Sequence, residues 1–252
     1  MNNTRLSTSG SPVLSIVLPA HNEAATIRET VLDYYNEIAT KLPSALIVAE
    51  DGSADQTPQI LRSLANEIPI SLLSFKERKG FAKGVSDALK NCEGEWIFFS
   101  DSDGQYFPID FWRLWENRLE YDMVIGWKTH RSDTAYRIVL SRFFHTLVNM
   151  LFRLSFRDFD CGFRLMRRDV VDSIIDETNI LKYSFWTEFT VRASLKGFKI
   201  FETPIRHSSR KNGSTRIYKP RKLPLLVFNQ LKGLVTLSRV TRSIQIKRQQ
   251  NT

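Results

Sequence analysis

The sequence predicts an α/β fold in which a mostly parallel sheet is flanked by helices. The chain has 252 residues, of which 42% are hydrophobic, and this suffices for one domain with a substantial core. Short apolar segments alternate with amphipathic ones roughly every 25 to 30 residues, which is typical of βαβ units. Polar residues also gather directly after several of the apolar segments. Ligands of parallel sheets bind beyond the carboxyl ends of the strands, so we expect one shared site there.

The first half of the chain shows this alternation most regularly. Its expected strands are apolar runs rich in β-branched residues, at residues 13–19, 44–51, 70–75 and 96–100. Helices are expected from Asn22, as an N-cap, to about residue 40, from Asp55 onward, and over residues 80–91. The fourth strand runs directly into the carboxylate-rich turn DSDG.

The second half is less regular but contains the same kinds of element. We expect strands at residues 122–127 and 198–204, and helices at residues 135–156 and 184–196. Two basic segments, KTHRSD and HSSRKNGSTRIYKPRK, read as loops after the strands. The chain shows no internal repeat and no linker. We therefore expect one domain over residues 1–220 and a basic amphipathic C-terminal segment over residues 221–252.

The charge of the chain is distributed unevenly. The formal net charge is +9, from 36 basic and 27 acidic side chains, and the last acidic residue is Glu202. Residues 203–252 carry twelve Lys or Arg, so the first 202 residues have 24 basic side chains against 27 acidic ones. Such asymmetry points to an anionic partner, which is a nucleic acid, a lipid surface or a phosphorylated substrate.

Cysteine usage and the chain start bear on location. Cys92 and Cys161 show no metal-ligand spacing, which favours a reducing compartment. The first twelve residues contain no apolar segment typical of a secretory signal. No run of about 18 apolar residues occurs, so no ordinary membrane-spanning helix is expected. We therefore expect a cytoplasmic protein.

The DSD sequence after the fourth strand is a candidate metal site. Asp101 and Asp103 lie two residues apart at a strand end, where both carboxylates can hold a hard cation such as Mg²⁺ and leave positions for phosphate oxygens. Gln105 offers a further oxygen ligand or a supporting contact. A turn with an Asx cap is the alternative interpretation.

The first two strand ends carry further polar candidates. Asp51 can accept hydrogen bonds from a base or ribose, although EDGSADQT also reads as the start of a helix. Pro19 and Asn22 account for a strand stop and a cap. His21 and Glu23 remain available to face a nucleotide.

Seven motifs follow one another along the chain: LSIVLPAHNE, VAEDGSADQT, KGFAKG, FSDSDGQYFP, VIGWK, DFDCGFRLMRR and FWTE. Taken in this order they resemble family 2 glycosyltransferases of the GT-A (Rossmann-like) fold, and among these the polyprenyl-phosphate glycosyltransferases, the group that includes dolichol-phosphate mannose synthase. The resemblance covers about residues 13 to 218, and any single motif in it is common.

The resemblance implies roles for individual residues. Nucleotide-sugar contacts are implied for Pro19, His21, Glu23, Asp51, Gly80, Asp101, Ser102, Arg210 and Arg216, and a catalytic role for Asp103, Lys128 and Arg210. Metal ligation of Mg²⁺ or Mn²⁺ is implied for Asp101, Asp103 and Gln105. Positions on the acceptor side are implied for Arg131, Arg137, Asp160, Arg164 and Glu188. Lys128 stands where the family usually has Arg, which keeps the charge but loses the bidentate geometry.

The physical chemistry of the residues agrees with this assignment. Arg210, Gly213, Ser214 and Arg216 resemble a loop that closes over the leaving diphosphate, and closure would exclude water. A phosphate-monoester acceptor is already an anion near neutral pH, so it needs no strong general base. Asp160 and Glu188 can then orient cations or abstract protons, and Asp160 can also pair with Arg164 or a neighbour.

We therefore expect an inverting, metal-dependent transfer of a hexose from a UDP- or GDP-sugar to a polyprenyl phosphate at the cytoplasmic membrane face. Residues 135–156 and 223–246 combine apolar and basic residues, which is typical of helices at an anionic membrane surface. Packing of their apolar faces on the domain is the alternative. The enzyme would be peripheral, or would rely on a membrane-anchoring subunit or on a homo-oligomer.

Three other functions stay open at this point. One is a family 2 transferase with a saccharide or other soluble acceptor, which usually needs a carboxylate base. Another is a scaffold that binds a nucleotide sugar without turnover. A nucleic-acid-binding protein would fit the sequence pI of about 9.6, but it leaves the acidic strand ends unexplained, so we expect no nucleic-acid partner.

Overall fold

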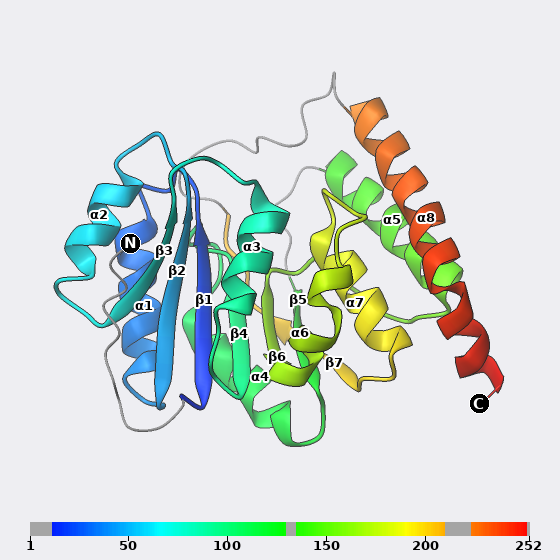
Figure 1. Cartoon of the computed structure of the whole chain (residues 1–252), viewed down its shortest axis with the longest axis horizontal. Coiled ribbons are helices and arrows are strands. Elements are labelled where there is room, and N and C mark those ends of the chain that lie inside the picture. Colours follow the sequence, from blue (N-terminus) through cyan, green and yellow to red (C-terminus); the bar gives the residue numbers. More distant parts are fainter. Residues whose placement is uncertain (1–11, 130–134, 210–222, 251–252) are drawn as a thin grey trace.

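The computed structural model describes residues 12–129, 135–209 and 223–250 (Figure 1). Within these ranges one seven-stranded sheet has the order β3-β2-β1-β4-β6-β5-β7. The strands are β1 Leu14–Ala20, β2 Ser44–Asp51, β3 Ile70–Phe75, β4 Trp96–Ser100, β5 Met123–Lys128, β6 Phe163–Arg167 and β7 Ile200–Ile205. β6 runs antiparallel to its neighbours β4 and β5, and the other paired strands are parallel. The predicted mostly parallel sheet is therefore confirmed.

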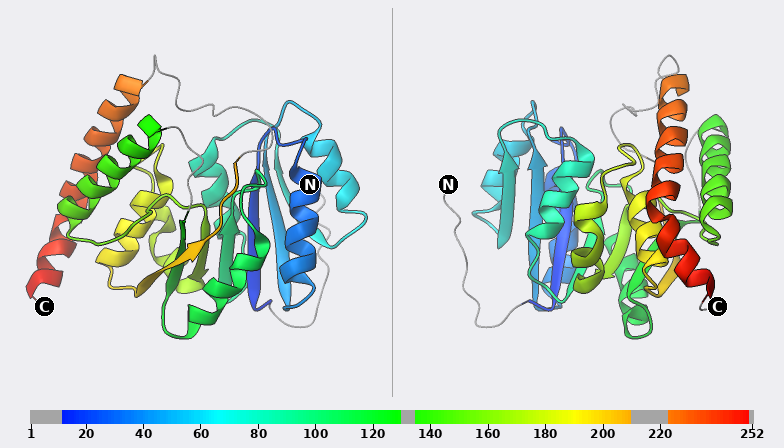
Figure 2. Two further views of the ribbon diagram at one scale, coloured as in Figure 1. Left: turned by 180° about the vertical axis from the view of Figure 1, so that it is seen from behind. Right: turned by 45° about the vertical axis from the view of Figure 1, so that its right-hand side comes forward.

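Helices cover both faces of the sheet. They are α1 Ile27–Tyr34, α2 Thr57–Leu64, α3 Phe81–Lys90, α4 Phe111–Glu116, α5 Ala135–Phe152, α6 Arg168–Ile174, α7 Phe185–Leu195 and α8 Leu223–Gln250. Short 3₁₀ turns lie at Pro108–Asp110, Asn117–Leu119 and Ile175–Glu177, and a π-helical turn, Tyr35–Ala39, extends α1. α1 and α4 lie on one face, and α3 and α6 lie on the other (Figures 1 and 2). The main core is formed by the apolar side chains between these layers.

The start of the first helix differs from the prediction. α1 begins at Ile27, and Asn22 is not its N-cap but adopts a left-handed conformation with φ 55°. Asn22 instead joins two strand ends: its main-chain nitrogen donates to Ser53 Oγ over 2.8 Å, and its Oδ1 accepts from Ala54 N over 2.7 Å. The next helix, α2, begins at Thr57 with Gln56 as its N-cap, one residue after the predicted Asp55. Asp55 still supports this helix start, because its Oδ1 accepts a hydrogen bond from Thr57 N over 3.0 Å.

Several elements of the second half were not predicted as such. α4, α6 and β6 all lie in segments whose apolar residues show no clear period. β6 is buried on both faces and includes a fully buried arginine, Arg164. A charged residue inside a buried strand breaks the apolar run by which such strands are recognised.

The described part of the C-terminal segment is a long helix that packs on the domain. α8 contacts α7 and α5, and its Leu234 and Leu237 join a second core cluster that includes Val148 of α5 and Val191 of α7. Gly233 faces Leu181 at this contact: a Cβ there would lie 2.6 Å from Leu181 Cδ2, so the end of that side chain would have to shift. Among the described residues, no helix combines the length and the apolarity needed to cross a bilayer.

Candidate active site

The carboxyl ends of β1, β2 and β4 are joined by hydrogen bonds. His21 Nδ1 donates to the main-chain oxygen of Asp51 over 2.8 Å. The hydroxyl of Ser102, which is buried, donates to the main-chain oxygen of Pro19. The polar clusters that follow these strands therefore share one edge of the sheet, as the sequence predicts. The buried hydroxyl of Ser102 thus connects two strand ends, and the expected nucleotide contact of Ser102 stays a prediction.

Asp51 organises the loop before α3. Its Oδ1 accepts a hydrogen bond from Lys79 N over 2.6 Å, and its Oδ2 accepts one from Gly80 N over 2.9 Å. Gly80 has φ 86°, a conformation that favours glycine, and it directly precedes the first turn of α3. The half-buried Glu23 lies on the neighbouring loop, where its main-chain nitrogen donates to Thr57 Oγ1 over 2.9 Å. The structure thus brings together the residues expected around a nucleotide.

The DSD turn lies against the segment before β6. Asp101 and Asp103 are both half-buried, and Asp101 N donates to Gly162 O over 3.0 Å. A Cβ at Gly162 would lie 2.0 Å from Asp101 Oδ2. Gly162 is therefore a positioning residue for the Asp101 carboxylate, and the sequence reasoning passed over it. The signal was the glycine inside the DCGFR motif.

Gln105 links the DSD turn to the segment that follows β7. Its Nε2 donates to Ser208 O over 2.9 Å, and Ser208 N donates to Gln105 O over 2.9 Å. Its main-chain nitrogen also donates to Asp103 Oδ1 over 3.2 Å. The donor set of two carboxylates and one amide oxygen is the hard-oxygen type that Mg²⁺ and Mn²⁺ favour. These residues therefore fit the metal that the sequence predicts.

Lys128 lies at the same edge, at the end of β5. Its Nζ is 5.6 Å from the centre of the Tyr106 ring, and the Tyr106 hydroxyl accepts a hydrogen bond from Gly162 N over 3.2 Å. A cation thus lies close to the DSD turn and to the DCGFR segment. Four further expected residues cannot be compared: Arg131, Arg210 and Arg216 lie outside the described residues, and so does the side chain of Arg137. The same holds for Gly213 and Ser214 of the expected closing loop.

Arg164, expected on the acceptor side, is fully buried. Its guanidinium donates to the main-chain oxygens of Phe159 and Cys161 over 3.0 and 2.7 Å, and it lies 4.0 Å from the centre of the Trp186 ring. Burial lowers its pKa to about 10. Arg164 thus holds the loop before β6 through main-chain carbonyl groups, and its expected place on the acceptor side stays a prediction.

Glu188 is also fully buried. Its Oε2 accepts hydrogen bonds from Ile180 N and Leu181 N, both over 2.7 Å, and its Oε1 accepts from Asn179 N over 3.2 Å. Arg192 Nη2 lies 2.9 Å from Oε1. Both carboxylate oxygens are therefore occupied by groups of the protein itself, and the expected place of Glu188 on the acceptor side stays a prediction.

Asp160 is paired, but with a histidine rather than with Arg164. Its Oδ1 accepts from Thr187 Oγ1 over 2.7 Å, and its Oδ2 lies 3.7 Å from His145 Nε2. Burial opposes ionisation, but the hydrogen bonds and charge of His145, with Thr187, leave the pKa of Asp160 below its usual value. Burial alone would lower the pKa of His145, but the charges of Asp160 and Asp158 raise this pKa above its ordinary value. His145 was missed because a histidine on an apolar helix reads as a core residue.

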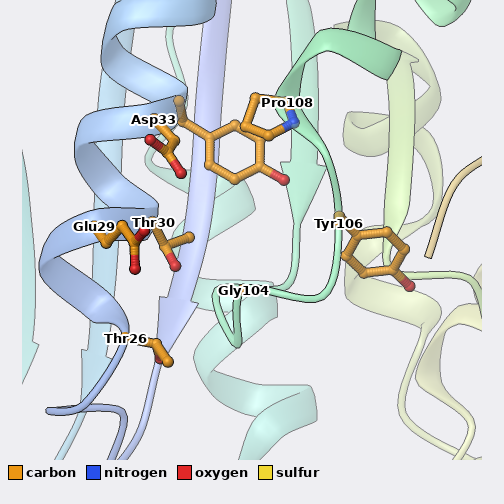
Figure 3. A pocket seen from close by; sticks show the side chains of 8 residues that line it. Thr26, Glu29, Thr30, Asp33, Gly104, Tyr106 and Pro108 are labelled. Atoms are coloured by element: carbon orange, nitrogen blue, oxygen red, sulfur yellow. The ribbon is translucent and has the colours of Figure 1, made fainter. Parts of the chain in front are cut away.

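A small pocket lies beside the DSD turn, between α1 and the segment that follows the turn (Figure 3). It contains none of the expected site residues. Its lining combines carboxylates and hydroxyls of α1 with the turn itself: Thr26, Glu29, Thr30, Asp33, Tyr34, Gly104, Tyr106 and Pro108. This pocket therefore lies next to the candidate site and shares the DSD turn with it through Gly104.

Comparison with known proteins gives a match over most of the domain. The family described as Glycosyl transferase family 2 matches residues 15–175. The chain is 32% identical over 211 residues to Glycosyltransferase AglD of Haloferax volcanii. The aligned region covers 79% of this chain and 33% of that protein. It is 25% identical over 229 residues to Undecaprenyl-phosphate 4-deoxy-4-formamido-L-arabinose transferase of Yersinia enterocolitica, with 88% and 68% covered. The chain thus spans one third of the first relative and about two thirds of the second.

Two further matches agree with these. Dolichyl-phosphate beta-glucosyltransferase of Dictyostelium discoideum is 25% identical over 213 residues, covering 76% of this chain and 65% of that protein. Among solved structures, glucosyl-3-phosphoglycerate synthase from Mycobacterium tuberculosis, in complex with Mn²⁺, UDP-glucose and phosphoglyceric acid, superposes with a TM-score of 0.67. That match has 17% sequence identity and covers 90% of this chain and 80% of the other. At this identity the structural match shows the fold alone.

Proposed function

The chain belongs to glycosyl transferase family 2, and on this premise we propose that it transfers a hexose from a nucleotide-diphospho-sugar to a polyprenyl phosphate. Two of its relatives are named as transferases that act on undecaprenyl phosphate and dolichyl phosphate. The names support the acceptor class. The geometry of the acceptor side supports it independently.

The observation that carries the proposal is the burial of Glu188. A hydroxyl acceptor needs a carboxylate base within reach of its proton, and both oxygens of Glu188 are already occupied by main-chain N–H groups and Arg192. Asp160, whose pKa is lowered, is a weak base. A phosphate monoester is ionised near neutral pH and attacks without a base. The acceptor side therefore favours a phosphate over an alcohol.

The donor is proposed to bind along the ends of β1, β2 and β4. Pro19, His21, Glu23, Asp51 and Gly80 would surround the nucleoside. Asp101, Asp103 and Gln105 would hold Mg²⁺ or Mn²⁺, which supplies positive charge to the leaving diphosphate. A solved structure of the same fold contains Mn²⁺ and UDP-glucose, which is the kind of donor and metal proposed for this chain. Whether the donor nucleotide is UDP or GDP is decided by the experiment below.

Cations complete the proposed site. Lys128 lies at the correct edge to meet a phosphate, and Arg210 and Arg216 are proposed to close over the diphosphate. The pairing of Gln105 with Ser208 supports this, because it holds the chain beside the DSD turn two residues before Arg210. Arg131 and Arg137 are proposed to meet the acceptor phosphate. Arg210→Ala should slow transfer far more than it weakens binding of the bare nucleotide.

We further propose that the transfer inverts the anomeric centre and takes place at the cytoplasmic face of a membrane, with the enzyme associated peripherally. Association can be direct, through a membrane-anchoring subunit, or as a homo-oligomer. The proposed acceptor supports a membrane location, since a polyprenyl chain is held in the bilayer.

The deciding experiment compares acceptors that differ by one phosphate. UDP- and GDP-sugars are incubated with the enzyme and Mn²⁺, with a short polyprenyl phosphate or with the matching polyprenol, and released nucleotide and lipid-linked sugar are measured. We expect transfer from one donor to the phosphate and none to the alcohol. Equal transfer to the polyprenol, or transfer to a soluble saccharide instead, would contradict the proposal. Donor binding without turnover on any acceptor would favour a scaffold.

A further inference from the structure

One end of the molecule carries most of its exposed apolar side chains. α5 and α8 lie side by side there (Figures 1 and 2). Of the 16 large exposed hydrophobic residues in the described chain, ten belong to these two helices. We define the α5–α8 face by the most exposed of them: Val139, Phe143, Met150, Leu225, Phe228 and Val240, each at least 57% exposed. Isolated exposed apolar residues are normal, but a cluster of this kind marks a binding surface.

The apolar residues of each helix form two stripes. Val148 on α5, with Leu234 and Leu237 on α8, packs in the cluster that contains Val191 of α7. Val139, Phe143 and Met150 follow one another at helical spacing on the other side of α5, as Leu225 and Phe228 do on α8. Because the buried stripes both point toward α7, the exposed stripes both point away from it. Packing within the chain therefore uses one face of each helix and leaves the other open.

The charge of this surface has one sign. The sequences of α5 and α8 contain no Asp and no Glu. Four cations lie exposed among the apolar residues, namely Arg142, Lys232, Arg239 and Arg242. A surface that is both apolar and exclusively basic is complementary to a partner with an apolar interior and an anionic rim.

We propose that the α5–α8 face is a docking surface for a bilayer that contains anionic lipids. The proposal deepens the proposed function, on which it rests for the membrane location of the acceptor. A second copy of the chain is the less favourable occupant, because two such faces would bring cations against cations. The apolar side chains would enter the acyl boundary, and the four cations would meet the lipid phosphates.

The docking surface also orients the site. α5 begins seven residues after Lys128, and α8 follows the segment that Ser208 holds at Gln105. Both helices begin at the same end of the molecule (Figure 1). On its reverse side α5 presents His145 to Asp160. One helix thus connects the bilayer surface to the acceptor side of the site.

The test is vesicle flotation of the full chain. Wild type is compared with Phe143→Ser/Phe228→Ser and with Arg239→Glu/Arg242→Glu, on vesicles of phosphatidylcholine alone or mixed with phosphatidylglycerol. The matched control is Leu119→Ser, because Leu119 is 82% exposed in a 3₁₀ turn outside this face. We expect wild type and the control to bind the anionic vesicles in a salt-sensitive manner. Each double variant should bind at least about tenfold more weakly, since a buried Phe contributes roughly that much or more.

Two further measurements keep the outcomes distinct. Transfer to a short, water-soluble polyprenyl phosphate without vesicles should be unchanged in the variants, and light scattering on a sizing column should find the same mass for all. If wild type transfers sugar but does not bind anionic vesicles, the proposed docking surface is wrong and the proposed function is unaffected. If wild type is a dimer and the double variants are monomers, the α5–α8 face is a homodimer interface and the proposed membrane docking is wrong. Vesicle binding without any transfer would contradict the proposed function and not the docking surface.

Discussion

The proposed donor region and the proposed acceptor region contain the same residue types in different surroundings. At the ends of β1, β2 and β4, Asp101 and Asp103 are half-buried. Around α7, Arg164 and Glu188 are fully buried and bound to main-chain groups of their own loops. A charged residue in a motif can therefore act on a ligand or hold the loop that does. Burial, which the motif does not reveal, separates the two roles.

The largest effect is expected at the donor edge, from Asp103→Asn. The loss of one carboxylate would remove a proposed metal ligand and its negative charge. We expect transfer to fall about 10²- to 10³-fold even at saturating Mg²⁺ or Mn²⁺, the scale of losing one electrostatic group. The measurement is steady-state transfer at increasing metal concentration, with the melting temperature as a check on folding. Full activity of the variant at high metal concentration would show that Asp103 is not a metal ligand.

A second substitution acts between the two regions. Gly162→Ala places a Cβ 2.0 Å from Asp101 Oδ2, so the carboxylate or the loop must shift. We expect transfer to fall by roughly 10- to 100-fold, since misplacement of about 1 Å costs that order. Gly84→Ala is the matched control, because its Cβ would make only ordinary contacts, the shortest 3.7 Å to Asp51 Cγ. Equal activity of the two variants would show that Gly162 does not position Asp101.

On the acceptor side, Glu188→Gln should affect stability rather than chemistry. Replacing the buried carboxylate leaves Arg192 with Glu177 as its remaining carboxylate partner and weakens three hydrogen bonds from main-chain N–H groups. Breaking a buried pair typically costs about 3 kcal/mol or more. We expect a fall of that size in the free energy of unfolding by urea. Activity per folded molecule should stay close to wild type. Asp176→Asn serves as the control, since it removes an exposed pair with Lys90 that is worth below about 1 kcal/mol.

The contrary result for Glu188 is also informative. A variant that folds with wild-type stability but loses transfer by about a hundredfold would show that the carboxylate acts on the acceptor as a base. That outcome would mean that the acceptor is a hydroxyl compound and not a phosphate. It would also remove the contrast between the two regions.

The smallest effect is expected from His145→Gln, and it depends on pH. The raised pKa of His145 means that its pairing with Asp160 stabilises the fold fully below about pH 6.5, the unfolded value, and is lost as pH rises through the folded pKa. The lowered pKa of Asp160 makes its contribution present above about pH 4 and lost on acidification. The variant should thus lose more stability at pH 5.5 than at pH 8.5, by less than about 1 kcal/mol. A difference that is the same at both pH values would mean that His145 acts through packing alone.

Local patterns in the sequence predicted the sheet and its polar edge. Alternation of apolar and amphipathic segments is a short-range signal, and polar residues at strand ends follow from it. Contacts between distant residues were not predictable in this way. Asn22 was read as a helix cap, but its partners Ser53 and Ala54 lie on another strand end. The pairing of His145 with Asp160, and the enclosure of Arg164, likewise depend on segments that only the fold brings together.

The antiparallel strand β6 imposes an order on how the sheet assembles. Among the described strands, β4 pairs with β1 and β6, and β5 pairs with β6 and β7. β5 is made before both of its partners, so it has no place in the sheet until residues 163–167 have left the ribosome. The four strands β3, β2, β1 and β4 can join earlier, with β4 as an open apolar edge. That edge is the point at which a nascent chain is exposed to mispairing, and the insertion of β6 ends the exposure.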